Sequence, residues 1–185
     1  MSGLPIHDIR KRFETSKDFN EIFEAFQHAL RQRIDDIELY RQLFWNHSLS
    51  PDELKLFGEK LSLEFSHIAY DVYMWLASVF EATTSMNDNY ELALEYYRKA
   101  AQAESAHLEP YLYAADCFEP DLNIPSVAVL INFLKEGIQK VSAPKLLYQR
   151  LSHLYEIAGN DEMSDYCRRK AGEEPPPSQD VAPGL

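Results

Sequence analysis

Two short motifs decide the fold of this chain: YMWLASVF at residues 73–80 and ALEYYRKA at residues 93–100. The first motif places two aromatic residues, with aliphatic or small residues between them, on one face of a helix. The same pattern recurs in three other places: Tyr40, Leu43, Phe44 and His47; Tyr111, Ala114, Ala115 and Phe118; and Tyr148, Leu151, Ser152 and Tyr155. From Tyr40 to Tyr73, Tyr111 and Tyr148, the copies lie 33, 38 and 37 residues apart. A repeat of this length predicts a stacked helical array.

A second helix is expected before each of these tyrosines. Residues with i, i+4, i+7 spacing share one helix face, and four such triplets occur: Ile22, Phe26 and Ala29; Leu54, Gly58 and Leu61; Ala93, Tyr97 and Ala100; and Leu130, Leu134 and Gly137. The middle member of each triplet lies 14 or 15 residues before the next tyrosine. This near-constant distance predicts a short, fixed turn between repeats, so that loops of variable length fall inside the repeats.

These motifs resemble those of the tetratricopeptide-repeat (TPR) family. In that family the first helix carries an aromatic, Leu-Gly or Leu-Ala and a second aromatic, and the second helix carries Ala, an aromatic and Ala. The run from Ala93 to Ala101 is also similar to the related Sel1-like repeats. The resemblance covers residues 16–172 and implies an all-α, right-handed superhelix of antiparallel helix pairs, with about eight or nine helices in all.

The resemblance also sets the expected domain limits. Residues 1–15 are interpreted as an N-terminal lead-in, and residues 16–172 as the repeat domain, with Thr15 or Ser16 capping its first helix. Ser50, Pro51 and Glu53 form the clearest helix-start signal, because a serine cap with glutamate three residues later makes a capping box. Residues 173–185 are rich in proline and charge but offer little to bury, so a disordered tail is predicted there.

Composition narrows the functional classes. The chain has 185 residues, 45% of them hydrophobic and 12% aromatic, which excludes a disordered protein. The net charge of −12 repels phosphate groups, so we expect binding neither to nucleic acid nor to anionic membranes. No apolar run is long enough to span a membrane, and the N-terminus lacks the apolar segment of a secretory signal. Cys117 and Cys167 are interpreted as core residues in a reducing compartment, which favours a cytoplasmic location.

Motifs that would indicate chemistry are weak. Two E-x-x-H pairs, Glu64 with His67 and Glu104 with His107, have a spacing that di-iron helical bundles use. The repeat register places both pairs at helix ends or in turns, where they would not converge in a bundle core. No phosphate-binding glycine motif or nucleophile motif occurs. We therefore expect no enzymatic activity, no cofactor and no metal, and a di-iron enzyme is kept only as a distant alternative.

A partner-binding surface is the favoured function. In the resembled family the first helices of the repeats line a concave groove, so the resemblance implies that side chains on these helices contact a partner. Gln42 is one such residue. The candidate set comprises Arg41 and Trp45; Asp71, Met74, Trp75 and Ser78; Glu109, Leu112, Tyr113 and Asp116; and Gln149, Arg150 and His153. Aromatic residues beside charged ones are typical interface anchors. A protein, helix or peptide with basic and apolar groups is the predicted partner, and a structural subunit that self-associates through its repeats is the alternative.

Overall fold

The computed structural model describes residues 3–83 and 88–172. The Pro-rich tail of residues 173–185, for which disorder is predicted, lies outside these ranges. The described residues form ten α-helices and a short 3₁₀ helix, η1: α1 (Ile6–Thr15), α2 (Phe19–Arg31), α3 (Ile37–Phe44), α4 (Pro51–Glu64), η1 (Ser66–Ile68), α5 (Ala69–Ala82), α6 (Asp88–Ala103), α7 (Glu109–Asp116), α8 (Val127–Ile138), α9 (Lys145–Ile157) and α10 (Asp161–Ala171). The all-α prediction is confirmed.

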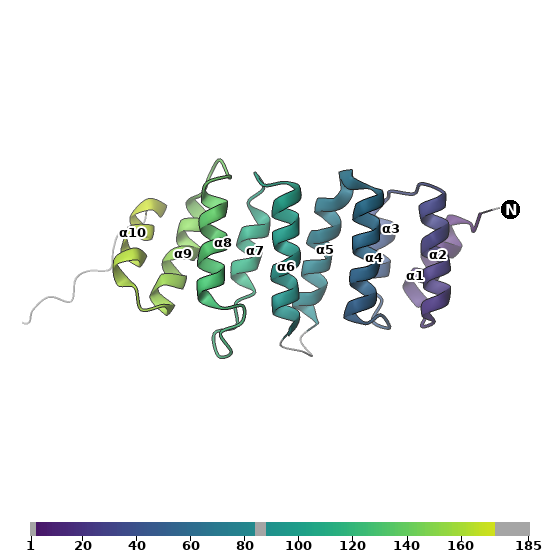
Figure 1. Cartoon of the computed structure of the whole chain (residues 1–185), viewed down its shortest axis with the longest axis horizontal. Coiled ribbons are helices and arrows are strands. Elements are labelled where there is room, and N and C mark those ends of the chain that lie inside the picture. The colour runs from purple at the N-terminus through teal and green to yellow at the C-terminus, as the bar shows by residue number, and fades with distance from the viewer. Residues whose placement is uncertain (1–2, 84–87, 173–185) are drawn as a thin grey trace, which may run out of the picture.

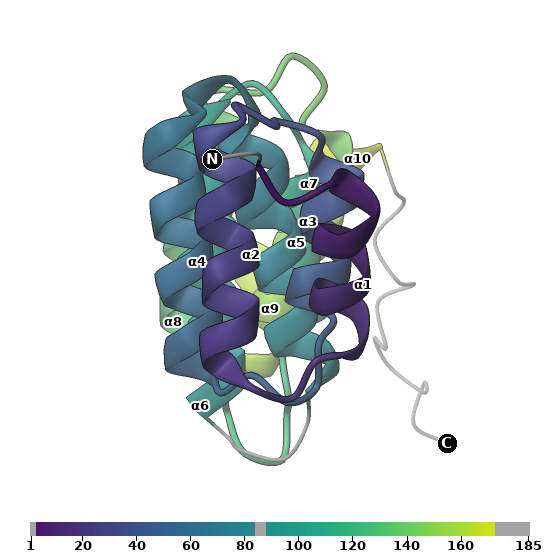
Figure 2. The ribbon, with the colours of Figure 1, turned by 90° about the vertical axis from the view of Figure 1, so that its right-hand side faces the viewer.

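The helices form two layers along an elongated array (Figure 1). Helices α2, α4, α6 and α8 make the front layer, here called the even-helix layer. Helices α1, α3, α5, α7 and α9 lie behind them and make the odd-helix layer, and the view from the N-terminal end separates the two at α1 and α2 (Figure 2). Helix α1 packs against α2, each helix from α4 to α8 packs against the next one in the chain, and α10 packs against α9 at the end. This is the predicted right-handed superhelix of helix pairs.

The array starts earlier in the chain than the repeat motifs indicate. Residues 6–15, expected to belong to a lead-in, form α1, which packs against both α2 and α3. Its Ile9 and Phe13 are fully buried, and the Phe13 ring lies 6.1 Å from that of Tyr40. The expected total of eight or nine helices is therefore wrong, because one more helix completes the first pair. The i, i+4 spacing of Ile9 and Phe13 is the local reason for that helix.

The repeated positions supply most of the core. Tyr40, Tyr97 and Tyr111 are almost completely buried, whereas Tyr73 and Tyr148 are only partly buried. The Tyr111 ring packs against α8 where Gly137 has no side chain. A β-carbon there would lie 2.7 Å from the ring, so glycine is required for this approach.

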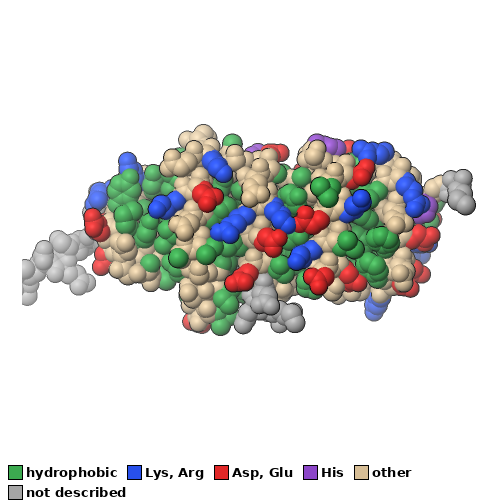
Figure 3. All heavy atoms as spheres, viewed as in Figure 1, with side chains coloured by type: hydrophobic (Ala, Val, Ile, Leu, Met, Phe, Trp, Pro, Cys, Tyr) green, Lys and Arg blue, Asp and Glu red, His purple; other side chains and the backbone are tan. Residues whose placement is uncertain are grey.

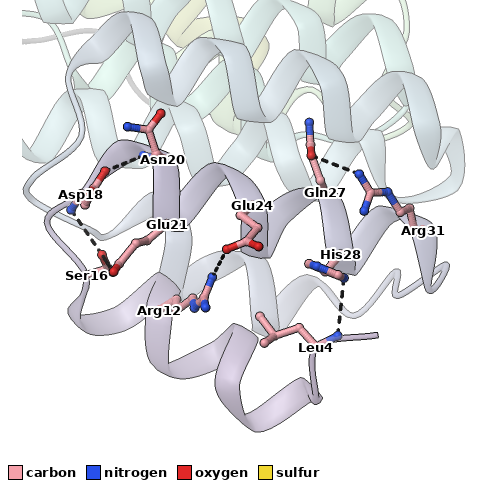
Figure 4. Close-up of polar contacts among 10 residues, drawn as sticks. All are labelled: Leu4, Arg12, Ser16, Asp18, Asn20, Glu21, Glu24, Gln27, His28 and Arg31. Atoms are coloured by element: carbon pink, nitrogen blue, oxygen red, sulfur yellow. Dashed lines mark hydrogen bonds and ion pairs between the residues drawn. The ribbon is translucent and has the colours of Figure 1, made fainter. Parts of the chain in front are cut away.

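Helix starts follow the sequence signals in part. The Ser50 capping box is confirmed: the Glu53 N–H donates to the Ser50 hydroxyl at 3.3 Å, and the Ser50 N–H donates to the Glu53 carboxylate at 2.7 Å. The expected cap of α2 at Thr15 or Ser16 is wrong. Asp18 caps α2 by accepting from the Asn20 N–H at 2.8 Å (Figure 4), because α1 already occupies the chain up to Thr15.

Candidate partner-binding surface

The predicted contact residues lie on one layer. They come from α3, α5, α7 and α9 of the odd-helix layer, except Trp45, which directly follows α3 as its C-terminal cap. These helices stand behind the front row in Figure 1, on the opposite side of the array from the even-helix layer. Neighbouring helices of this layer pack together at α1–α3, α3–α5 and α7–α9. Rigid helices thus hold the candidate side chains in a fixed order along the array.

Trp75 and Arg41 belong to neighbouring repeats and contact each other. Trp75 on α5 is half-buried against the core, and the Arg41 guanidinium of α3 lies 5.4 Å from its ring centroid. Arg41 also pairs with Glu38 at 3.0 Å. A cation over an indole face is a favourable arrangement. One face of the tryptophan is therefore covered by a positive charge that belongs to the protein itself.

Tyr113 on α7 is the most exposed aromatic of the candidate set, at 46%. Its ring packs edge-on against the buried Tyr97, with centroids 6.2 Å apart. The Tyr97 hydroxyl donates to Glu81 at 2.7 Å, and burial together with this contact raises the pKa of Tyr97. Tyr113 therefore rests on a fixed neighbour and leaves nearly half of its surface to solvent.

Trp45 lies apart from the other aromatic candidates. It lines a space of about 180 Å³ near the ends of α3 and α5, together with Val79 and Thr83. Among residues 3–83 and 88–172, no ring contact joins Trp45, Trp75 and Tyr113 to one another. The three aromatic side chains therefore lie at separate points along the layer, with Trp45 and Tyr113 exposed and Trp75 half-buried.

The charges of the candidate surface are partly paired. Asp116 of α7 accepts two hydrogen bonds from Arg150 of α9, from Nε at 2.6 Å and from Nη2 at 3.2 Å. The hydrogen bond from Arg150 to Asp116 raises the pKa of Arg150. These residues, with His153 and Gln149, line a hollow of about 340 Å³ between α7 and α9. Asp71 and Glu109, the other acids of the candidate set, are exposed as well, and Glu109 lies 3.8 Å from His107.

A second cluster at the start of α5 and α7 was missed by the sequence reasoning. The rings of Tyr70 and His107 lie 4.7 Å apart, beside Asp71 and Glu109. Burial, followed by the charges of Glu109 and Asp71, raises the pKa of Tyr70 to about 12. Their spacing is a sequence signal for this contact, because Tyr70 and His107 are 37 residues apart, which is one repeat length.

The residues of the two E-x-x-H motifs form separate ion-pair contacts. Glu64 pairs with Arg33, His67 contacts Asp35 at 2.9 Å, and His107 contacts Glu104 at 2.8 Å. Within the described part of the chain, no group of three or more His, Cys, Asp or Glu side chains is placed to hold a metal ion.

Both cysteines are buried and unpaired, as expected for core residues. Burial raises the pKa of the Cys117 thiol to about 12, which keeps it protonated at neutral pH. A thiol without its thiolate form is a poor nucleophile.

Among the helices that the structure describes, none combines the length and apolar character needed to cross a membrane.

Comparison with known proteins identifies the fold. No protein-family model matches the chain, and no curated protein matches it. A crystal structure of MamA is similar, with a TM-score of 0.52 and 17% sequence identity over 89% of this chain and 92% of that chain. A second MamA crystal structure gives a TM-score of 0.49 at 15% identity, over 96% of both chains. A crystal structure of BtubC (BKLC) from P. vanneervenii gives 0.45 at 14% identity, over 97% of this chain and 77% of that one. The first of these likenesses establishes a TPR-like helical-repeat fold for this chain.

Proposed function

We propose that the odd-helix layer binds a protein or peptide partner. The observation that carries the proposal is Tyr113, an aromatic side chain fixed against Tyr97 on a rigid helix and 46% exposed. Large aromatic side chains on rigid supports lose little conformational entropy on binding, and they are frequent binding hot spots. The half-buried Trp75 on the neighbouring α5 supplies a second anchor.

The charges of the layer favour a partner with basic and apolar groups. Asp71 on α5 and Glu109 on α7 are exposed acids on the same layer as Tyr113, and the chain as a whole has a net charge of −12. Such charges speed the encounter with a positive surface and disfavour an acidic one. Arg150 forms an ion pair with Asp116, so its positive charge does not neutralise Asp71 or Glu109.

The hollow between α7 and α9 gives the partner a place for a side chain. Its walls combine Phe118 and Leu154 with the Asp116–Arg150 pair and His153. An apolar side chain with a neighbouring amide or hydroxyl suits this mixture. The layer thus offers one protruding aromatic and one recess, on the adjacent α7 and α9.

Photo-crosslinking tests the proposal and captures the partner in one experiment. A benzophenone amino acid at position 113 should crosslink a protein in native cell extract, and mass spectrometry then identifies it. With that protein purified, Tyr113→Ala should raise the dissociation constant roughly 5- to 150-fold, the range of an interface anchor.

Leu63→Ala is the matched control, because Leu63 is 81% exposed on α4 of the opposite layer. It removes a comparable apolar group and should leave the dissociation constant unchanged. The opposite pattern, with an effect from Leu63→Ala and none from Tyr113→Ala, would place the partner on the even-helix layer. Circular dichroism must first show that both variants fold.

A further inference from the structure

A strip of α6 is open to solvent on the even-helix layer. Glu91, Leu94, Glu95, Arg98 and Gln102 follow one another along the helix and border a hollow of about 470 Å³ between α6 and α8. The far wall is formed by Asn123, Pro125, Ser126 and Val129. Along this side of α6 the charged and polar side chains of Glu91, Glu95, Arg98 and Gln102 are exposed, whereas Leu94 between them is buried.

Two charges on this strip have no ionic partner among the described residues. Glu91 and Arg98 are both exposed, and neither forms an ion pair within residues 3–83 and 88–172. The Arg98 guanidinium lies 5.7 Å from the centroid of the Phe133 ring on α8, which places it on the wall of the hollow. By contrast, Glu95 and Lys99 pair with each other at 2.9 Å.

The spacing of these two charges makes the strip complementary to itself. Glu91 and Arg98 are seven residues apart, so they lie on one face of α6 and about 10 Å apart along its axis. When two such helices lie antiparallel, Glu91 of each faces Arg98 of the other. A twofold axis passing beside Leu94 and Glu95 satisfies both pairs at once, as an isologous interface requires.

We propose that a second copy of this chain docks on this face, with α6 against α6 across a twofold axis. Charge complementarity selects the second copy as occupant. Among the α6 residues that border the hollow, the acids Glu91 and Glu95 balance the bases Arg98 and Lys99, and Figure 3 shows basic and acidic side chains intermingled over the middle of this layer. In a chain of net charge −12, a locally neutral face is where two copies meet with the least repulsion.

Charge reversal tests the interface directly. Sedimentation equilibrium of the full chain at low salt, up to about 1 mM protein, should show a monomer–dimer equilibrium that weakens with added salt. Glu91→Arg and Arg98→Glu should each raise the dimer dissociation constant roughly tenfold or more, because each places like charges opposite one another. The double variant Glu91→Arg/Arg98→Glu restores opposite charges and should dimerise as the parent does.

The mixture of the two single variants is the sharpest arm of the test. The Glu91→Arg chain carries only bases at these two positions and the Arg98→Glu chain only acids, so the mixture should form a heterodimer. Lys60→Glu, an exposed reversal on α4, is the matched control and should leave the equilibrium unchanged. A parent that stays monomeric, single variants that dimerise like the parent, or a mixture that stays monomeric would each overturn the proposal. Tyr113→Ala should not alter this equilibrium, which separates it from partner binding at the odd-helix layer.

Discussion

The seam between α2 and α4 and the seam between α6 and α8 hold equivalent places in the even-helix layer, yet one is filled and the other is open. In the first, Phe57 of α4 packs against Phe19, Phe23 and Phe26 of α2, with ring centroids 4.9–6.3 Å apart. In the second, a hollow of about 470 Å³ lies between α6 and the first turn of α8 with the loop before it, and charged side chains of α6 border it. The α2–α4 seam therefore stabilises the N-terminal half through apolar packing, whereas the α6–α8 seam leaves charged side chains of α6 in contact with solvent.

The difference follows from the residues that each helix presents to its neighbour. Four phenylalanine rings fill the α2–α4 seam, and such rings bury large areas and pack edge-to-face. At the α6–α8 seam, α6 presents Glu91, Glu95 and Arg98, which retain their hydration. In a repeat array each pair needs only its neighbours for stability. One seam can therefore stay open without unfolding the rest.

The largest effect should come from emptying the filled seam. Phe57 is fully buried, so Phe57→Ala should lower the free energy of unfolding by about 3–5 kcal/mol. Val129→Ala removes a half-buried side chain beside the open hollow and should cost less than about 1 kcal/mol. Urea denaturation followed by circular dichroism measures both. Equal losses for the two variants would mean that the seams do not differ in the way described.

A smaller effect should show that the C-terminal half is nevertheless closely packed between its two layers. A β-carbon at Gly137 would lie 2.7 Å from the buried Tyr111 ring, so Gly137→Ala should cost roughly 1–3 kcal/mol through overpacking. Asn132→Ala, on an exposed position of the same helix, should stay within about 0.5 kcal/mol of the parent. A parent-like melting temperature for Gly137→Ala would show that the α7–α8 contact can relax.

The smallest effect concerns the polar attachment of α1 to α2 in the filled half. Arg12 donates to Glu24 at 2.6 Å (Figure 4), and this hydrogen bond, with the charge of Arg12, holds the pKa of Glu24 below its ordinary value of 4.5. A lowered carboxyl pKa adds stability that is present above pH 4.5 and disappears as the pH falls through the folded-state value. Arg12→Ala should therefore be less stable than the parent at about pH 7, and the difference should shrink at about pH 3.

Arg10→Ala is the control for that measurement, because Arg10 is exposed on the same helix and has no ion pair with another described residue. Its difference from the parent should not change in the same way with pH. A gap between Arg12→Ala and the parent that persists in acid would assign the effect to lost packing of the Arg12 stem.

The repeated motifs carried the fold prediction a long way. The spacing from Tyr40 to Tyr148 indicated paired helices, and the triplets such as Ala93, Tyr97 and Ala100 indicated the second helix of each pair; the structure confirms both. The prediction failed at α1, because this helix has a single aromatic residue, Phe13, and none of the Leu, Ala or Gly residues that the motif places between two aromatics. A search for apolar spacing alone, without the family pattern, would have found this helix.

For the candidate surface, the residues that share a layer could be predicted from the repeat pattern, because helix periodicity fixes the direction of each side chain relative to its own helix. Which of them contact one another became visible in the folded chain: Arg41 lies over Trp75, Asp116 pairs with Arg150, and Tyr113 packs on Tyr97. Such contacts depend on how neighbouring helices rotate and how closely they approach. That is set by packing between side chains distant in the sequence, such as Tyr111 against Gly137, and no local pattern encodes it.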